Sequence, residues 1–349
     1  PMRNSECGFR NEIHHPFLKA YRFARQRMKI KEPTFGYHED DIKELLGKKE
    51  GTELQQKVLQ ARKAHKSVGF IGGPPCPDFS VGGKNRGRYG KNGILSKVYI
   101  DLIVAQQPDF FLFENVKGLW RTKTHREFYE ALKRKLSVAG YETTERLINA
   151  IEYGVPQDRD RIILVGFNKK TFTSKLGNNL TNFPWLKFAK FSRDEAFGKQ
   201  WVEKEVFEEN LSRKMPQGII EEVTVEHWFR KNDVENHPNA QHYFKPRAAL
   251  VRFKSVPEGD DSKKSFKRLH RWRYSPTAAY GNNEVHLHPY KARRLTVAEA
   301  LAVQSLPKSF VLPGDISLSD QFKAVGNGVP FLAARSIAMA IKDFIKSIL

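Results

Sequence analysis

An alternation of short apolar runs with amphipathic segments constrains the fold of this chain more than any other feature. Apolar runs at 67–71, 110–116 and 161–167 are bounded by turn-forming or polar residues, which predicts buried strands. Helical spacing of apolar residues predicts helices over 54–66, 97–106 and 126–139. Strands that alternate with helices indicate βαβ units, so we expect an α/β fold around a mainly parallel sheet.

The two ends of the chain differ from its middle in the periodicity of their apolar residues. Residues 168–290 have weak periodicity, many aromatic residues and dense charge, whereas Pro330–Ile348 has a helical apolar pattern that we expect to pack back on the sheet. We therefore predict one domain from 1–167 plus 320–349 and a smaller, irregular domain from 168–319. Because the first residue is Pro1 rather than Met, we expect the N-terminus to be truncated.

The charge of the chain predicts a polyanionic partner. Lys and Arg number 60 against 39 Asp and Glu, a formal net charge of +21, so nucleic acid is the first candidate and an anionic membrane surface the second. Residues 241–275 combine many cations with aromatic side chains, which suits contacts with phosphates and bases. An ordinary solvated basic face is the alternative. We expect Arg271 and Arg273, in this stretch, to contact phosphate.

Several functional classes are disfavoured by composition. The two cysteines, Cys7 and Cys76, cannot form a disulfide scaffold, and zinc-finger spacing is absent, so we predict no metal site. An uninterrupted run of 18 apolar residues is also absent, so we expect no membrane span and a reducing, intracellular compartment.

Two polar residues lie where a parallel sheet binds its ligands, beyond the carboxyl ends of its strands. Cys76 follows the first apolar run in the sequence GGPPCPDFS and is a candidate nucleophile; the alternative is a small buried apolar residue. Glu114 ends the second run and could act as a general acid and base; the alternative is an ordinary polar strand end.

Two further segments could contact a ligand. Arg159 and Arg161, in QDRDR, should point the same way in a strand and could clamp a carboxylate or phosphate; ion pairs with Asp158 and Asp160 are the alternative. The loop GNGVP at 326–330 could present backbone groups to a cofactor, or be a plain turn.

The order PPCPDFS, ENV, QDRDR, RRLTVAEALAVQSLP and GNGVP resembles the motif order of the cytosine-5 DNA methyltransferase family. The resemblance implies a Rossmann-like, S-adenosylmethionine-dependent methyltransferase sheet with a smaller target-recognition domain. It also implies transfer of a methyl group to carbon 5 of cytosine in a specific double-stranded DNA sequence. A monomeric modification enzyme of a bacterial restriction–modification system, in the cytoplasm, is the usual setting.

The resemblance assigns roles to individual residues. Cys76 would attack carbon 6 of a flipped-out cytosine, Glu114 would hold the ring, and Arg161 with Arg159 would orient the base, Glu114 and the backbone. Ser80 would contact DNA phosphate, and Thr277 would lie near the DNA. The expected S-adenosylmethionine contacts are Glu12, Asp41, Ile42, Gly73, Pro75, Leu95, Asn327 and Val329.

One family motif is missing. The glycine-rich turn that opens the family's cofactor site is not found before Glu12. It could have been truncated, a partner chain could supply it, or the chain could be a catalytically incomplete DNA-binding relative or one half of a split enzyme. A tRNA cytosine-5 methyltransferase is a further alternative, disfavoured because its usual Cys-Phe-Thr sequence is absent.

Overall fold

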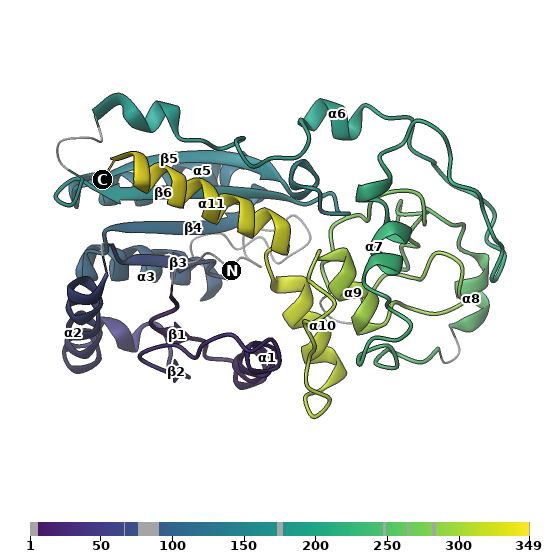
Figure 1. Ribbon diagram of the computed structural model, residues 1–349, viewed down its shortest axis with the longest axis horizontal. Coiled ribbons are helices and arrows are strands. Elements are labelled where there is room, and N and C mark those ends of the chain that lie inside the picture. Colours follow the sequence, from purple (N-terminus) through teal and green to yellow (C-terminus); the bar gives the residue numbers. More distant parts are fainter. Residues whose placement is uncertain are drawn as a thin grey trace.

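The computed structural model describes residues 6–65, 67–75, 91–172, 177–246, 249–263, 265–280 and 284–348. They form two lobes, one built around a sheet and the other with few regular elements (Figure 1). The strands are β1 (Arg10–Asn11), β2 (Tyr37–His38), β3 (Gly69–Gly72), β4 (Phe110–Val116), β5 (Tyr141–Asn149) and β6 (Asp160–Asn168). The α-helices are α1 (His15–Arg27), α2 (Lys48–Ala64), α3 (Lys91–Gln106), α4 (Lys117–Arg121), α5 (Lys123–Val138), α6 (Arg193–Phe197), α7 (Val225–Lys231), α8 (Leu250–Ser255), α9 (Val297–Val303), α10 (Leu318–Asn327) and α11 (Phe331–Ile348).

The strands of the larger lobe form two separate sheets. The main sheet has the order β3-β4-β6-β5, and β1 pairs in parallel with β2 in a second sheet. β3 and β4 are parallel, but β6 is antiparallel to both β4 and β5. The α/β fold is confirmed, and β3, β4 and β5 run in the same direction, so the main sheet is mainly parallel in strand direction with β6 reversed. β5, which sequence patterning missed, runs into β6 through a short connection, and such a link favours an antiparallel pair.

Helices cover both faces of the main sheet. The predicted strand at 110–116 is β4 with the same bounds, and the three predicted helices are α2, α3 and α5, each of which begins a few residues earlier than predicted. The predicted packing of the last helix on the sheet is confirmed. Phe344 of α11 contacts Phe167 of β6 and Phe183, with ring centroids 4.9 and 5.3 Å apart.

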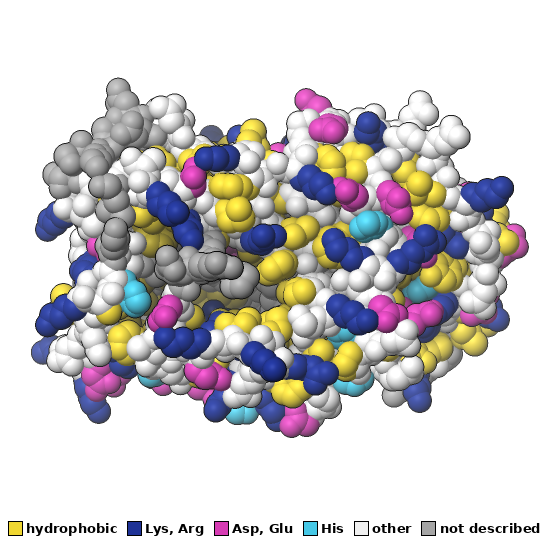
Figure 2. All heavy atoms as spheres, in the orientation of Figure 1, with side chains coloured by type: hydrophobic (Ala, Val, Ile, Leu, Met, Phe, Trp, Pro, Cys, Tyr) yellow, Lys and Arg dark blue, Asp and Glu magenta, His cyan; other side chains and the backbone are white. Residues whose placement is uncertain are grey.

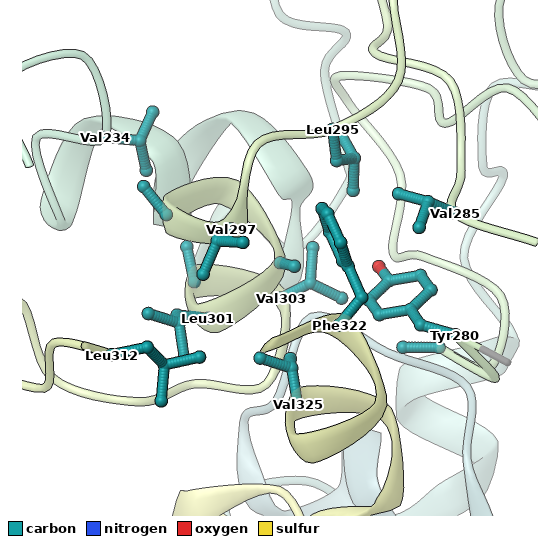
Figure 3. Packing of buried hydrophobic residues seen from close by; sticks show 14 of the residues in the cluster. Val234, Tyr280, Val285, Leu295, Val297, Leu301, Val303, Leu312, Phe322 and Val325 are labelled. Carbon is teal, nitrogen blue, oxygen red and sulfur yellow. The ribbon is translucent and has the colours of Figure 1, made fainter. Parts of the chain in front are cut away.

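The smaller lobe has a core of its own, although few of its residues are in helices. Phe322 and Val325 of α10 point toward Val303 and Leu301 of α9 (Figure 3). Thr296 begins α9 with a capping box, in which Thr296 and Glu299 each bond the other's backbone. Because α10 packs in this core, the core crosses the domain boundary that we predicted at residue 320.

One helical segment, Leu318–Ile348, is long and apolar enough to span a membrane by length and composition. It consists of α10 and α11, which are separated by extended backbone at Gly328 and by Pro330. The buried residues of both helices contribute to the cores of the two lobes. This packing gives the segment a structural role inside the protein.

Candidate active site

An ion pair between Glu114 and Arg161 lies at the carboxyl end of β4. Arg161 Nε is 2.8 Å from Glu114 Oε1, and the side chains are only 14% and 13% exposed. The antiparallel pairing explains the contact, because it places Arg161, at the start of β6, opposite Val116 at the end of β4. Arg161 Nη1 also donates to the carbonyl of Asp160 at 2.7 Å. The pair therefore holds a carboxylate with one oxygen beside a cation, and within the described part of the chain the other oxygen has no hydrogen-bond donor and can accept from a ligand.

The segment that leads to Cys76 packs against Glu114. A Cβ on Gly73 would come within 2.7 Å of Glu114 Oε2, so any larger residue at this position would displace the carboxylate from its place beside Arg161. Asn115 Nδ2 donates to the carbonyl of Pro74 at 3.4 Å and fixes the same segment from the next residue of β4. Cys76 and Ser80 themselves lie outside the described residues.

Arg159 points elsewhere than Arg161. Its guanidinium is buried and donates to backbone carbonyls of Ala278, Gly326 and Gly328, at 3.1, 2.8 and 3.2 Å. The prediction that the two arginines point the same way is wrong. It assumed that both lie in one strand, where residues two apart face the same side, but β6 begins at Asp160 and Arg159 precedes it. Through these contacts Arg159 positions the backbone at Ala278 and at residues 326–328.

Two glutamines complete this network, and sequence patterning missed both. Gln157 Nε2 donates to Gln304 Oε1 at 3.0 Å, and Gln304 Nε2 donates to the carbonyls of Val325 and Gly328. Both side chains are buried. The segment before β6 is thereby joined to the end of α10, where Asn327 lies. Both glutamines are in motifs that the sequence shows, Gln157 in QDRDR and Gln304 in AVQSLP, but nothing in the sequence shows that the two side chains meet.

Replacing Arg159 with Met should lower the free energy of unfolding by about 2–3 kcal/mol, because three carbonyls would lose a charged donor inside the protein. Urea denaturation measures this loss. Arg193→Met is the control, since Arg193 is partly exposed; it pairs with Asp160 at 3.1 Å and lies 5.6 Å from the ring centroid of Phe197. Equal small losses in both variants would contradict the positioning role.

A second polar network surrounds the start of β6. Asp160 accepts from Lys117 Nζ, from Arg193 Nη2 at 3.1 Å and from Asn149 Nδ2 at 3.0 Å. Burial raises the pKa of Asp160, but the hydrogen bond from Lys117 and the other donors outweigh it and lower the pKa overall. Sequence patterning gave Asp160 only as a surface alternative and missed Lys117, which directly follows ENV.

The predicted phosphate contacts of Arg271 and Arg273 are corrected by the structure. Arg271 is 5% exposed and binds Glu258 through Nε and Nη2, at 2.8 and 2.9 Å. Arg273 Nη2 pairs with Asp261 at 3.0 Å and also donates to the carbonyl of Gly259. Both cations hold the smaller lobe together, because their charges are used by buried or neighbouring acceptors.

Thr277 lies on the surface near the candidate site. Its hydroxyl donates to the carbonyl of Asp158 at 2.7 Å, and an isolated parallel bridge joins Ser275 to Gln157. The exposed segment around Thr277 is thus attached to the segment that carries Arg159 and Arg161. Figure 2 shows Lys and Arg side chains over both lobes on the face it presents.

The predicted cofactor residues lie in three groups. Glu12 follows β1 and Asp41 follows β2, and these parallel strands are also tied by Asn11 Nδ2, which donates to the carbonyl of Asp40 at 3.0 Å. Gly73 and Pro75 follow β3. Asn327 and half-buried Val329 flank the end of α10. Of the remaining two, Ile42 is half-buried against apolar clusters that include residues of α3 and β3, and Leu95 is half-buried in α3. The structure brings Glu12 and Asp41 to one end of the β1–β2 pair.

Two buried histidines of the smaller lobe predict a pH-dependent stability. Burial lowers the pKa of His286 to about 3, and burial lowers the pKa of His288 to about 4 although Glu299 opposes the shift. The unfolded chain therefore binds more protons below about pH 6.5, and stability falls as the pH falls from 6.5 toward these values.

Between pH 7 and pH 5, His286 should account for a loss of about 2 kcal/mol in the free energy of unfolding. Urea denaturation at both pH values checks this expectation. His286→Gln keeps a polar group beside Tyr280 Oη, which lies 3.4 Å from His286 Nδ1, but cannot titrate. The variant should therefore lose less stability over this interval than the unmodified chain, and an equal loss would refute the assignment.

The fold defines a class of protein: an α/β protein with a second, less regular lobe beside its sheet (Figure 1). Solved structures share this fold. One is a protein encoded within an Escherichia coli prophage and named as a DNA modification methyltransferase, with a TM-score of 0.58 at 18% identity over 97% of this chain and 92% of that one. Another is a variant of Spodoptera frugiperda DNMT2, with a TM-score of 0.55 at 16% identity over the same shares of each chain.

The family follows from the sequence comparisons. Residues 3–343 match the model of the C-5 cytosine-specific DNA methylase family, and the chain belongs to this family. Type II methyltransferase M.NmeDI of Neisseria meningitidis is 55% identical over 342 residues, which cover 98% of this chain and 79% of that relative. Type II methyltransferase M.MthTI of Methanothermobacter thermautotrophicus is 28% identical over 86% of this chain and 87% of its own length. The chain is thus a DNA (cytosine-5-)-methyltransferase, as its motif order predicts.

Proposed function

We propose that the chain methylates carbon 5 of cytosine within a specific double-stranded DNA sequence, as the modification enzyme of a type II restriction–modification system in the bacterial cytoplasm. The observation that carries the proposal is the Glu114–Arg161 pair beside Gly73, on the segment that leads to Cys76. This arrangement suits a planar, polar base better than a phosphate, because it combines an acceptor and a donor at one strand end.

The residues divide the chemistry as follows. The Cys76 thiolate forms a bond to carbon 6 of cytosine, which makes carbon 5 nucleophilic. Glu114 accepts from the exocyclic amine through one oxygen and, in its protonated form, donates a proton to nitrogen 3 of the ring through the other, while Arg161 fixes the orientation of the carboxyl group. After methyl transfer, a base takes the proton from carbon 5, the electron pair of that bond forms the double bond between carbons 5 and 6, and the bond from carbon 6 to sulfur breaks to release Cys76 as a thiolate. Arg159 positions the loop at 326–328.

S-adenosylmethionine, when bound, supplies the methyl group. The donor set fits it in part: the Glu12 and Asp41 carboxylates suit hydroxyl or amine donors, and Ile42 offers an apolar neighbour for a flat ring. Gly73, Pro75, Leu95, Asn327 and Val329 complete the proposed cofactor contacts. Glu12 is half-buried and accepts from the backbone N–H of His14 at 3.1 Å, so its carboxylate is already oriented.

Duplex DNA is the proposed substrate because the chain carries a formal charge of +21. A stacked cytosine hides its carbon 5, so the base must leave the helix at a cost of about a few kcal/mol. Ser80 and Thr277 remain proposed DNA contacts, and a monomer is the proposed active form. The alternative is a catalytically incomplete DNA-binding relative or one half of a split methyltransferase.

Trapping on fluorinated DNA tests the proposal. The chain is incubated with labelled S-adenosylmethionine and a library of duplexes that contain 5-fluorocytosine. Fluorine at carbon 5 blocks the final elimination, so a covalent protein–DNA complex that carries the label should accumulate. The matched control is Cys76→Ser, which should bind DNA without forming the complex. A labelled complex with the serine variant would refute Cys76 as the nucleophile, and DNA binding without any complex would favour the incomplete-enzyme alternative.

A further inference from the structure

Arg294 of the smaller lobe is half-buried among aromatic rings and has no acidic partner among the described residues. Three phenylalanine rings have their centroids 5.8 or 5.9 Å from its guanidinium carbon: Phe244, Phe253 and Phe266. The preceding residue differs, because Arg293 donates to both oxygens of Glu299 at 2.8 Å. The rings hold the Arg294 guanidinium in place but leave its charge without a counterion.

The burial of Arg294 is therefore uncompensated. Its Nε is buried and has no hydrogen-bond partner within the described part of the chain. Burial lowers the pKa of this guanidinium. Burial also disfavours the charge of Arg293, but the hydrogen bonds to Glu299 outweigh it and raise the pKa of that residue overall. Because a partly desolvated charge is costly without a partner, an anion beside Arg294 would stabilise it.

A second arginine approaches the same aromatic ring. Arg252, on α8, is exposed, and its guanidinium carbon is 4.5 Å from the centroid of Phe266. Both guanidinium groups are thus within 6 Å of one ring, and neither pairs with a carboxylate in the described ranges. Two like charges this close repel one another, so an anion that both contact would also remove this repulsion.

The ring between these contacts is held in an unusual backbone conformation. Phe266 has a φ of 62°, in the left-handed region, which aromatic residues rarely adopt. Its ring also packs against Phe253, with the ring centroids 5.6 Å apart. Strained residues of this kind are concentrated at binding sites, where the strain fixes a group in the position that binding requires.

Three other arginines of the lobe bind acceptors inside it. Arg268 donates to backbone carbonyls, and Arg271 and Arg273 pair with neighbouring carboxylates. These cations therefore stabilise the lobe itself. The charges of Arg252 and Arg294, in contrast, are available to an anion from outside.

We propose that Arg252 and Arg294 together bind one phosphate of the substrate DNA, with Phe266 holding both guanidinium groups. The inference rests on the proposed function, because it takes duplex DNA as the substrate. A phosphate suits the pair, since a guanidinium donates in parallel to two phosphate oxygens and two guanidinium groups can share them. Phosphate contacts fix the position of a protein on the duplex without reading its sequence. The site would therefore position the smaller lobe on DNA of any sequence.

The affinity for a duplex of random sequence, measured over a range of salt concentrations, tests the site. The double variant Arg252→Met/Arg294→Met should reduce the slope of log affinity against log salt by about 0.9, the value for one phosphate. Each single variant should reduce the slope less, because the other arginine still contacts the phosphate. Lys254→Met is the control, since Lys254 is on the same helix but lies 3.8 Å from Glu209; it should leave the slope unchanged.

Urea denaturation separates binding from a structural role. Because Arg252 is exposed, Arg252→Met should unfold at the same urea concentration as the unmodified chain and still reduce the slope. Arg294→Lys keeps the charge and should retain most of the slope that Arg294→Met loses.

Two results would overturn the proposal: a slope for the folded double variant equal to that of Lys254→Met, or a loss of affinity confined to one specific duplex, which would indicate a base contact. With normal trapping on fluorinated DNA, either result would refute this site and leave the proposed function intact. If the unmodified chain bound no duplex at all, both would be wrong.

Discussion

Glu114→Gln should lower the single-turnover rate of methyl transfer by about 10²–10⁴-fold, the range that a positioned acid or base contributes. The substitution keeps the shape of the side chain but removes the charge that Arg161 Nε meets at 2.8 Å. It also replaces one acceptor oxygen with a donor, which would oppose the amine of cytosine. DNA affinity should change little, because most of it comes from phosphate contacts elsewhere.

The control for this prediction is Glu142→Gln, a carboxylate on β5 that pairs with Lys169 at a partly exposed site. It should transfer methyl groups at the unmodified rate, because exposed ion pairs contribute little and the residue is outside the candidate site. If the rate of Glu114→Gln is within about threefold of the control rate, the loss is far smaller than a catalytic acid or base should cause. Glu114 would then not be a catalytic residue.

The Glu114–Arg161 pair shows what the sequence could and could not predict. Glu114 ends an apolar run that forms β4 with the predicted bounds, so its place at the carboxyl end follows from local pattern. Its contact with Arg161 depends on β6 being antiparallel, a property of the whole sheet that a nine-residue segment does not encode. For this reason the contact between Glu114 and Arg161 could be expected only from the resemblance to a family, and not from local sequence pattern.

The arginines illustrate a general limit of sequence reasoning. Arg159 and Arg161 are two residues apart, yet one donates to carbonyls of the smaller lobe and the other to a carboxylate of the sheet. A basic stretch such as 241–275 likewise mixes cations that face solvent with cations that neutralise buried acids. Composition counts both kinds alike, because the partners of each cation come from distant parts of the chain.

Arg271→Met should lower the free energy of unfolding of the smaller lobe by about 3 kcal/mol, the lower end of the cost of removing one partner of a buried ion pair. The lower end applies because Arg213 Nε still lies 3.4 Å from Glu258 Oε2. Glu258, whose side chain is 2% exposed, would lose both hydrogen bonds from the guanidinium, and the carbonyl of Leu211 would lose a donor at 2.7 Å. Burial raises the pKa of Glu258, but the hydrogen bonds from Arg271 outweigh it and lower the pKa overall. The variant should therefore also raise the pKa of the Glu258 carboxyl group.

Urea denaturation measures that loss, and the salt dependence of DNA affinity separates it from a phosphate contact. Each lost phosphate contact reduces the slope of log affinity against log salt by about 0.9, whereas a residue that only stabilises the lobe leaves the slope unchanged under conditions where the variant is folded. Lys254→Met is the control for stability, because Lys254 is mostly exposed and its nitrogen is 3.8 Å from Glu209; its loss should stay within about 0.5 kcal/mol. A reduced slope with unchanged stability for Arg271→Met would mean that this arginine leaves Glu258 to bind DNA, and the buried pair would then belong to the free protein only.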